Sequence, residues 1–224
     1  PHNYGILRTS AEDLKFYAKE IAEMGFQMNT HAIGDSTVSV LLNEYKKILK
    51  DIDDPRWRIE HSQVVDINEF ELYNEKILPS IQPTHATSDM YWAYDRLGSR
   101  IKGAYAFKDL LNSSGRVALG TDFPVEKVNP FHTFYSSVER KDLNGYPENG
   151  FQMENSLTRE ETLKGMTIWG AYFNFEEHEK GSLEVGKSAD FIVLNQNIME
   201  VEADLIPMTE VIRTYIDGEL VYSK

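Results

Sequence analysis

Short apolar segments alternate with amphipathic helical segments along the first 180 residues of the chain. The apolar segments lie around residues 26–31, 56–60, 78–83 and 116–120. Apolar residues at helical spacing mark helices at 14–22, 38–49, 99–112 and 158–171. Strands that alternate with helices form βαβ units, whose strands run parallel in one sheet. The alternation therefore predicts an α/β fold.

A side chain able to bind a metal or move a proton follows each apolar segment. These residues are His31, His61, His85 and Asp122, at intervals of 30, 24 and 37 residues. Each interval suits one strand plus one helix, and the strand ends of a parallel α/β barrel share the rim that carries active sites. Converging imidazoles and a carboxylate hold zinc and similar cations, which lower the pKa of bound water.

Each of these residues also has an ordinary structural interpretation. A single histidine at a strand end is more often a hydrogen-bonded structural residue than a ligand. An aspartate after Gly-Thr, such as Asp122, is usually a turn residue or a helix cap. The repetition at successive strand ends is the observation that favours a metal site, in which Asp122 could also accept and pass on a proton.

The chain changes character at Gly181. A strand pattern at residues 189–194 is followed by two more at 211–216 and 219–222, joined by Asp217-Gly218. A two-residue Asp-Gly connection is typical of a β-hairpin. Residues 181–224 therefore form a β-rich segment distinct from residues 1–180.

Composition excludes several classes of function. The 224 residues include 23 Lys and Arg against 36 Asp and Glu, a net charge of −13, and no cysteine. A negative field repels nucleic acid and anionic membranes, so we expect neither as a partner. Cysteine-based zinc sites, Fe–S clusters and thiol nucleophiles are excluded. The lack of cysteine favours a cytoplasmic location, but the sequence leaves the compartment undetermined.

Four segments together resemble the amidohydrolase superfamily, and most closely its family 3, which includes N-substituted formamide deformylases. They are His31-Ala32-Ile33-Gly34-Asp35, Arg58-Ile59-Glu60-His61-Ser62-Gln63, Gln82-Pro83-Thr84-His85 and Leu119-Gly120-Thr121-Asp122-Phe123-Pro124-Val125. Residues 181–190 resemble the return of that family's chain into a small β-sandwich domain. The resemblance follows the family's order over nearly the whole chain.

The resemblance implies roles for individual residues. His31 and His61 would be metal ligands at the ends of barrel strands five and six, and Asp122 the strand-eight carboxylate that binds metal and moves the proton. His85, at the end of strand seven, would face the substrate and steady its carbonyl oxygen or oxyanion. Asp89, Trp92, Arg100 and Arg140 follow in loops where similar proteins have substrate-binding residues, although such an arginine is often only solvated and Trp92 could simply pack.

The family's first ligand pair, a His-x-His after strand one, has no counterpart here, nor has its strand-four lysine or glutamate. The resemblance therefore implies the C-terminal half of a (β/α)8 TIM barrel, strands 5–8 within residues 1–180. Residues 181–224 would then be the C-terminal strands of the β-sandwich domain. A complete barrel takes about 250 residues. The open sheet edges would be covered by the missing N-terminal half of the barrel or by another copy of the chain.

The function expected from this resemblance is metal-dependent hydrolysis of a carbon–nitrogen bond, other than a peptide bond, in an amide or formamide-like small molecule. One or two divalent ions are expected, zinc first, with iron and manganese as alternatives. The alternative is a catalytically incomplete half-barrel module that serves assembly or binding. Bound metal and hydrolysis distinguish the two.

Overall fold

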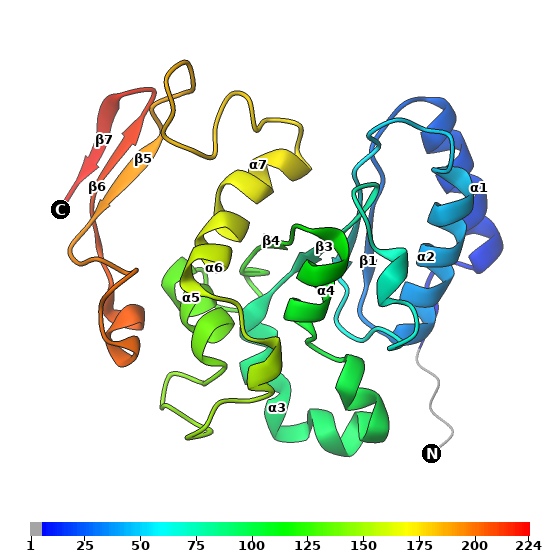
Figure 1. Ribbon diagram of the computed structural model, residues 1–224, viewed down its shortest axis with the longest axis horizontal. Coiled ribbons are helices and arrows are strands. Elements are labelled where there is room, and N and C mark those ends of the chain that lie inside the picture. Colours follow the sequence, from blue (N-terminus) through cyan, green and yellow to red (C-terminus); the bar gives the residue numbers. More distant parts are fainter. Residues whose placement is uncertain (1–5) are drawn as a thin grey trace. The chain divides into compact units, whose positions relative to one another are not determined.

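The computed structural model describes residues 6–224, which form two compact units (Figure 1). Residues 6–81 and 92–117 make up the first unit, and residues 82–91 and 118–224 the second. The β-rich segment 181–224 lies inside the second unit, so this division differs from the expected boundary at Gly181, which stays a prediction. Within residues 6–224, no helix combines the length and apolar composition needed to cross a membrane.

The first unit is built around parallel strands. Its elements are α1 (Ala11–Glu23), β1 (Asn29–Ala32), α2 (Asp35–Ile48), β2 (Trp57–His61), the 3-10 turn η1 (Phe70–Leu72), β3 (Ile77–Ile81), η2 (Gly98–Gly103) and α4 (Phe107–Ser114). Strand β2 pairs in parallel with β1 on one side and with β3 on the other. The predicted α/β class with a parallel sheet is thus confirmed.

Helix α2 covers the sheet because its apolar residues recur on one face. Val38, Leu41, Leu42 and Tyr45 are buried there, while α1 packs beside α2 (Figure 1). The Tyr45 ring meets the buried Trp57 of β2 edge to face at 4.8 Å. Its hydroxyl shares a hydrogen bond of 2.6 Å with Thr30 of β1, and burial raises the pKa of Tyr45. The helix is therefore fixed to two neighbouring strands.

The segment after β3 differs from the prediction. Strand β3 ends at Ile81, and helix α3 (Pro83–Leu97) begins two residues later, so His85 lies in the first turn of a helix. Proline suits the first helical turn because its missing N–H has no partner to lose there. The helix expected at 99–112 is instead η2 followed by α4, separated at Tyr105, whose φ is +52°.

The sequence pattern did not predict helix α3, because small residues fill its packed face. Ala86, Thr87 and Ala93 are buried, while the larger Tyr91 and Trp92 are exposed. An apolar period read from large side chains therefore does not detect this helix. Asp89 and Trp92, which we expected in loops, lie on it.

The second unit contains the first part of α3 and the C-terminal half of the chain. Its further elements are β4 (Ala118–Leu119), α5 (Pro130–Glu139), η3 (Met153–Asn155), α6 (Arg159–Met166), α7 (Ile168–Phe173), β5 (Phe191–Leu194), η4 (Ala203–Met208), β6 (Val211–Ile216) and β7 (Glu219–Ser223). Phe131, Phe134 and Tyr135 of α5 pack with Ile198 and Ile206 in a buried cluster. Strands β5, β6 and β7 form an antiparallel sheet.

Two local motifs in this unit, a helix cap and a hairpin turn, have the structures that are typical of their residues. Thr158 and Glu161 make a reciprocal capping box at the start of α6. Asp217 and Gly218 turn the β6–β7 hairpin with φ of +51° and +80°, the left-handed backbone that such a connection requires.

Candidate active site

The first unit brings two of the predicted metal ligands together. His31 of β1 and His61 of β2 lie on paired strands, where Ala32 is the register partner of His61. Their rings meet edge to face, with centroids 4.5 Å apart. His61 is buried, at 7% exposure. Two imidazoles at the ends of adjacent parallel strands fit the donor set of a divalent cation.

The backbone around His61 is held in an unusual conformation. His61 has a φ of +74° and Ser62 a φ of +44°, both in the left-handed region that non-glycine residues rarely occupy. The Ser62 hydroxyl donates to the carbonyl of Ile59 at 3.0 Å and accepts from the Tyr73 hydroxyl at 2.8 Å. These buried hydrogen bonds hold the bend that aims the His61 side chain. Such local strain, of order 1–3 kcal/mol, is concentrated at functional sites.

The second unit brings together the other two predicted site residues, His85 of α3 and Asp122 after β4. His85 Nε2 lies 3.0 Å from Asp122 Oδ2. Asp122 follows β4 with a φ of +58°, and its carbonyl accepts from the backbone N–H of Val125 at 2.8 Å. The turn after β4 therefore presents the carboxylate to the first turn of α3.

Glu126 belongs to this cluster, and the sequence reasoning missed it. Its Oε1 lies 3.5 Å from His85 Nδ1 and accepts a 2.6 Å hydrogen bond from the Ser88 hydroxyl. Both ring nitrogens of His85 thus face a carboxylate, Asp122 on one side and Glu126 on the other. The available signal was an acidic residue four positions after Asp122, inside the same turn. Only the fold shows that this residue reaches back to α3.

The four substrate-binding candidates have different surroundings. Asp89 is half-buried, and Trp92 is 46% exposed. Arg100 donates from Nη1 to Asp35 Oδ2 at 2.6 Å in the first unit. Arg140 caps α5 and is fully buried, and its Nε donates to the Phe151 carbonyl at 2.8 Å. Arg140 therefore braces a loop, and a role in substrate binding stays a prediction for all four.

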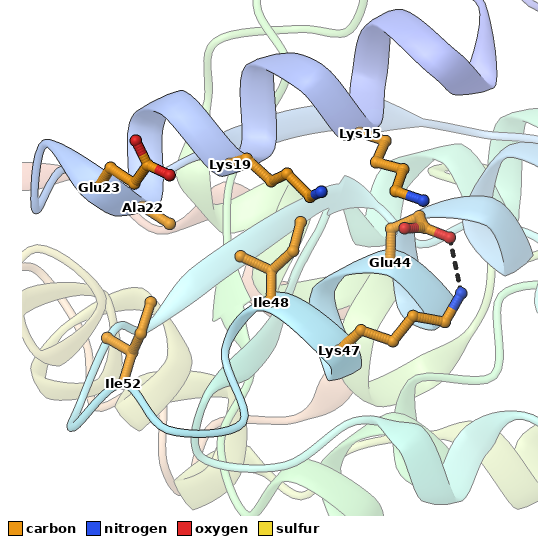
Figure 2. Close-up of a pocket in the computed structure, with 8 residues that line it drawn as sticks. All are labelled: Lys15, Lys19, Ala22, Glu23, Glu44, Lys47, Ile48 and Ile52. Atoms are coloured by element: carbon orange, nitrogen blue, oxygen red, sulfur yellow. Dashed lines mark hydrogen bonds and ion pairs between the residues drawn. The ribbon is translucent and has the colours of Figure 1, made fainter.

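An open hollow lies on the helical layer of the first unit. It measures about 660 Å³ between α1 and α2 and is lined by Lys15, Lys19, Ala22, Glu23, Glu44, Lys47, Ile48 and Ile52 (Figure 2). On its α2 side, Lys47 donates to Glu44 at 2.7 Å. None of the predicted site residues lines this hollow.

Ligand-type side chains thus follow successive strands of this α/β fold. Solved structures of metal-dependent hydrolases share the fold. A metal-dependent hydrolase from Pyrococcus horikoshii superposes with a TM-score of 0.77 at 27% identity, covering 91% of this chain and 41% of that one. A second, from Pyrococcus furiosus, gives a TM-score of 0.71, also at 27% identity, covering 84% of this chain and 37% of that one.

The family model described as "Amidohydrolase family" matches residues 4–222, so the chain belongs to the amidohydrolase family. Among curated relatives, the protein LONG AFTER FAR-RED 3 of Arabidopsis thaliana is 31% identical over 227 residues. The N-substituted formamide deformylase of Arthrobacter pascens is 21% identical over 223 residues. The alignments cover 99% and 96% of this chain but only 38% and 40% of those proteins.

Proposed function

We propose that the chain is part of a metal-dependent hydrolase that cleaves a carbon–nitrogen bond, other than a peptide bond, in an amide or formamide-like small molecule. The observation that carries this proposal is the His85–Asp122 pair, at 3.0 Å, whose residues follow β3 and β4. Membership of the amidohydrolase family supports it. The formamide deformylase among the relatives supports the substrate class.

The proposal includes a finer architecture. Strands β1 to β4 would be strands 5–8 of a (β/α)8 barrel, and β5 to β7 part of a small β-sandwich domain. Among the described residues, strand β1 is paired along one edge, with β2, and it is the first strand of its sheet. The preceding half of the barrel, or a second copy of the chain, would pair with its other edge, because an open strand edge invites pairing.

His31, His61 and Asp122 would hold the divalent cation, because two imidazoles and a carboxylate suit zinc, with iron and manganese as alternatives. The close approach of the His31 and His61 rings fits this assignment. One or two ions are compatible with the donor set. When bound, the cation polarises the substrate carbonyl and lowers the pKa of water.

The protein's own residues would then manage the proton. Asp122 accepts it from the attacking water and passes it to the departing nitrogen. His85 holds the Asp122 carboxylate through Nε2, while Glu126 faces Nδ1 and fixes the orientation of the ring. A hydrogen bond from His85 to the developing oxyanion stays a prediction, and it would require the ring to leave one of these carboxylates.

Metal analysis and one substitution test the proposal. We expect bound divalent metal by mass spectrometry and formate release from N-substituted formamides. Asp122→Asn should lose turnover by at least about a hundredfold because a general base contributes about 10²–10⁴-fold. Asp51→Asn, an exposed aspartate after α2, is the matched control. Full turnover in Asp122→Asn would refute the proton role, and absence of both metal and hydrolysis would favour the catalytically incomplete module.

A further inference from the structure

We propose that Tyr91 and Tyr146 form a preformed subsite for an aromatic ring of the substrate. The proposal rests on the proposed hydrolase function and names the substrate class of the same site. Tyr91 belongs to α3, and Tyr146 to the loop between α5 and η3. Their rings are stacked, with centroids 5.6 Å apart and planes at 12°, yet the residues are 59% and 56% exposed.

The geometry of the pair leaves ring surface available. Stacked carbon atoms lie about 3.5 Å apart at contact. A centroid separation of 5.6 Å therefore requires a sideways offset of about 4 Å between the rings. The two rings form a step, in which part of each face is uncovered. A third ring can stack on one tyrosine and meet the other at its edge, which are the two arrangements that aromatic pairs prefer.

The loop that carries Tyr146 is fixed by hydrogen bonds. Asp142 Oδ1 accepts from the backbone N–H groups of Asn144 at 2.8 Å and Tyr146 at 2.9 Å, and the Asp142 N–H donates to the Tyr146 carbonyl at 2.8 Å. At the base of the loop, the Phe151 N–H donates to the Arg140 carbonyl at 2.8 Å. The backbone position of Tyr146 is thus set before any ligand binds.

Tyr91 is fixed by the same carboxylate. Its hydroxyl donates to Asp142 Oδ2, and this hydrogen bond raises the pKa of Tyr91. One aspartate therefore holds both the ring on the helix and the ring on the loop. Two large rings held in solvent by polar contacts add little to the core of the fold. A preorganised aromatic surface lowers the entropic cost of ligand binding.

The subsite and the His85–Asp122 pair share helix α3. Tyr91 follows His85 by six residues, which is a rise of about 9 Å along the helix and a change of direction of about 120° around it, so a substrate that reaches both needs a long spacer. All of these residues belong to the second unit. Beside Asp122, the side chains of Phe123 and Val125 are 63% and 72% exposed, so the surroundings of the carboxylate are also apolar. We therefore infer an amide whose aromatic ring is joined to the scissile C–N bond by a flexible spacer.

Two formamides that differ only in the ring test the inference. N-(4-phenylbutyl)formamide carries an aromatic ring, and N-(4-cyclohexylbutyl)formamide a saturated ring of the same carbon count. Stacking adds to the effect of apolar burial, so we expect kcat/KM to favour the phenyl compound by about fivefold. Tyr146→Leu should reduce this preference to less than about twofold, because neither compound then finds a second ring to stack against.

Matched variants separate stacking from folding. Tyr146→Phe keeps the ring and should keep the preference, and so should Tyr94→Leu, which removes another exposed tyrosine of α3. Tyr146→Leu leaves the hydrogen bond between Tyr91 and Asp142 in place, so its fold is expected to persist. An unchanged preference in this variant, or no preference in the wild type, would overturn the inference.

A binding measurement tests the aromatic subsite separately from the proposed hydrolase function. If neither formamide is hydrolysed, the proposed function fails, and ligand-detected NMR then measures the binding of the same two compounds. Tighter binding of the phenyl compound that is lost in Tyr146→Leu would support the subsite. Equal binding of both compounds to the wild type would refute it.

Discussion

Removal of the Glu126 carboxylate should slow catalysis with little effect on folding. Glu126 touches His85 at Nδ1 while Asp122 occupies Nε2, so it is a positioning residue that acts through His85. In Glu126→Ala the imidazole loses the acceptor on one side and can rotate away from Asp122. We therefore expect kcat to fall while KM and bound metal stay close to their wild-type values.

The magnitude follows from the contacts that are lost. Loss of a side chain that orients a group of the active site costs about 10–100-fold in activity. The Ser88 hydrogen bond to Glu126 is exposed and contributes no more than about 0.5–1.5 kcal/mol to stability. The Glu126 side chain is 21% exposed, so its truncation leaves no buried cavity. Activity should thus change far more than the free energy of unfolding.

Steady-state kinetics of formate release, urea unfolding and metal analysis measure the three quantities. Glu126→Gln keeps an oxygen that can accept from Ser88 and His85, and it should recover a large part of kcat. Glu154→Ala, which removes an exposed glutamate of η3, is the control and should behave as the wild type. If Glu126→Ala kept more than half of kcat, or lost activity only in proportion to unfolding or metal loss, the positioning role would be refuted.

Other predictions concern the fold and its pH dependence. Gly103→Ala places a Cβ 1.9 Å from the carbonyl oxygen of Val65 and should cost at least about 1–3 kcal/mol in urea unfolding, whereas Gly34→Ala meets no atom within 4 Å and should cost far less. Thr158→Ala removes the N-cap of α6 and should lower the melting temperature through a loss of about 0.5–2 kcal/mol. Burial raises the pKa of Asp142, but hydrogen bonds from Tyr91 and the loop backbone outweigh it, and the folded pKa is lowered. The stability that wild type holds over Asp142→Asn should therefore be present above about pH 4 and decline as the pH falls through the folded pKa; an equal difference at pH 7 and pH 2 would contradict this.

The strand–helix alternation was predictable because its signals are local. Segments such as β2 bury every second residue, and α2 buries one helical face, so apolar spacing alone places them. The candidate ligands were also visible in the sequence, because His31, His61 and Asp122 each stand at the end of a predicted strand segment or shortly after it. Local order was therefore sufficient to place the strands, helix α2 and these candidates, whose role as ligands stays a prediction.

Other features depend on contacts between distant residues. Helix α3 packs through alanine and threonine, whose burial depends on the close approach of neighbouring elements. Glu126 acquires its place through Ser88, which is 38 residues earlier. Tyr91 and Asp142 are 51 residues apart and meet only after the chain has folded. No spacing rule relates such pairs, so their roles could be seen only in the structure.

Backbone strain gives a separate indication of which strand-end residues matter. His61 and Asp122 have φ angles of +74° and +58°, where glycine is the least costly residue. The same backbone also occurs at Tyr105 and Asp217, where it only makes a turn, so a positive φ by itself does not mark a ligand. At His61 and Asp122 it coincides with a ligand-type side chain directly after a strand, and each bend is held by hydrogen bonds of its own turn. It is this coincidence, and not the strain alone, that supports a chemical role for the two residues.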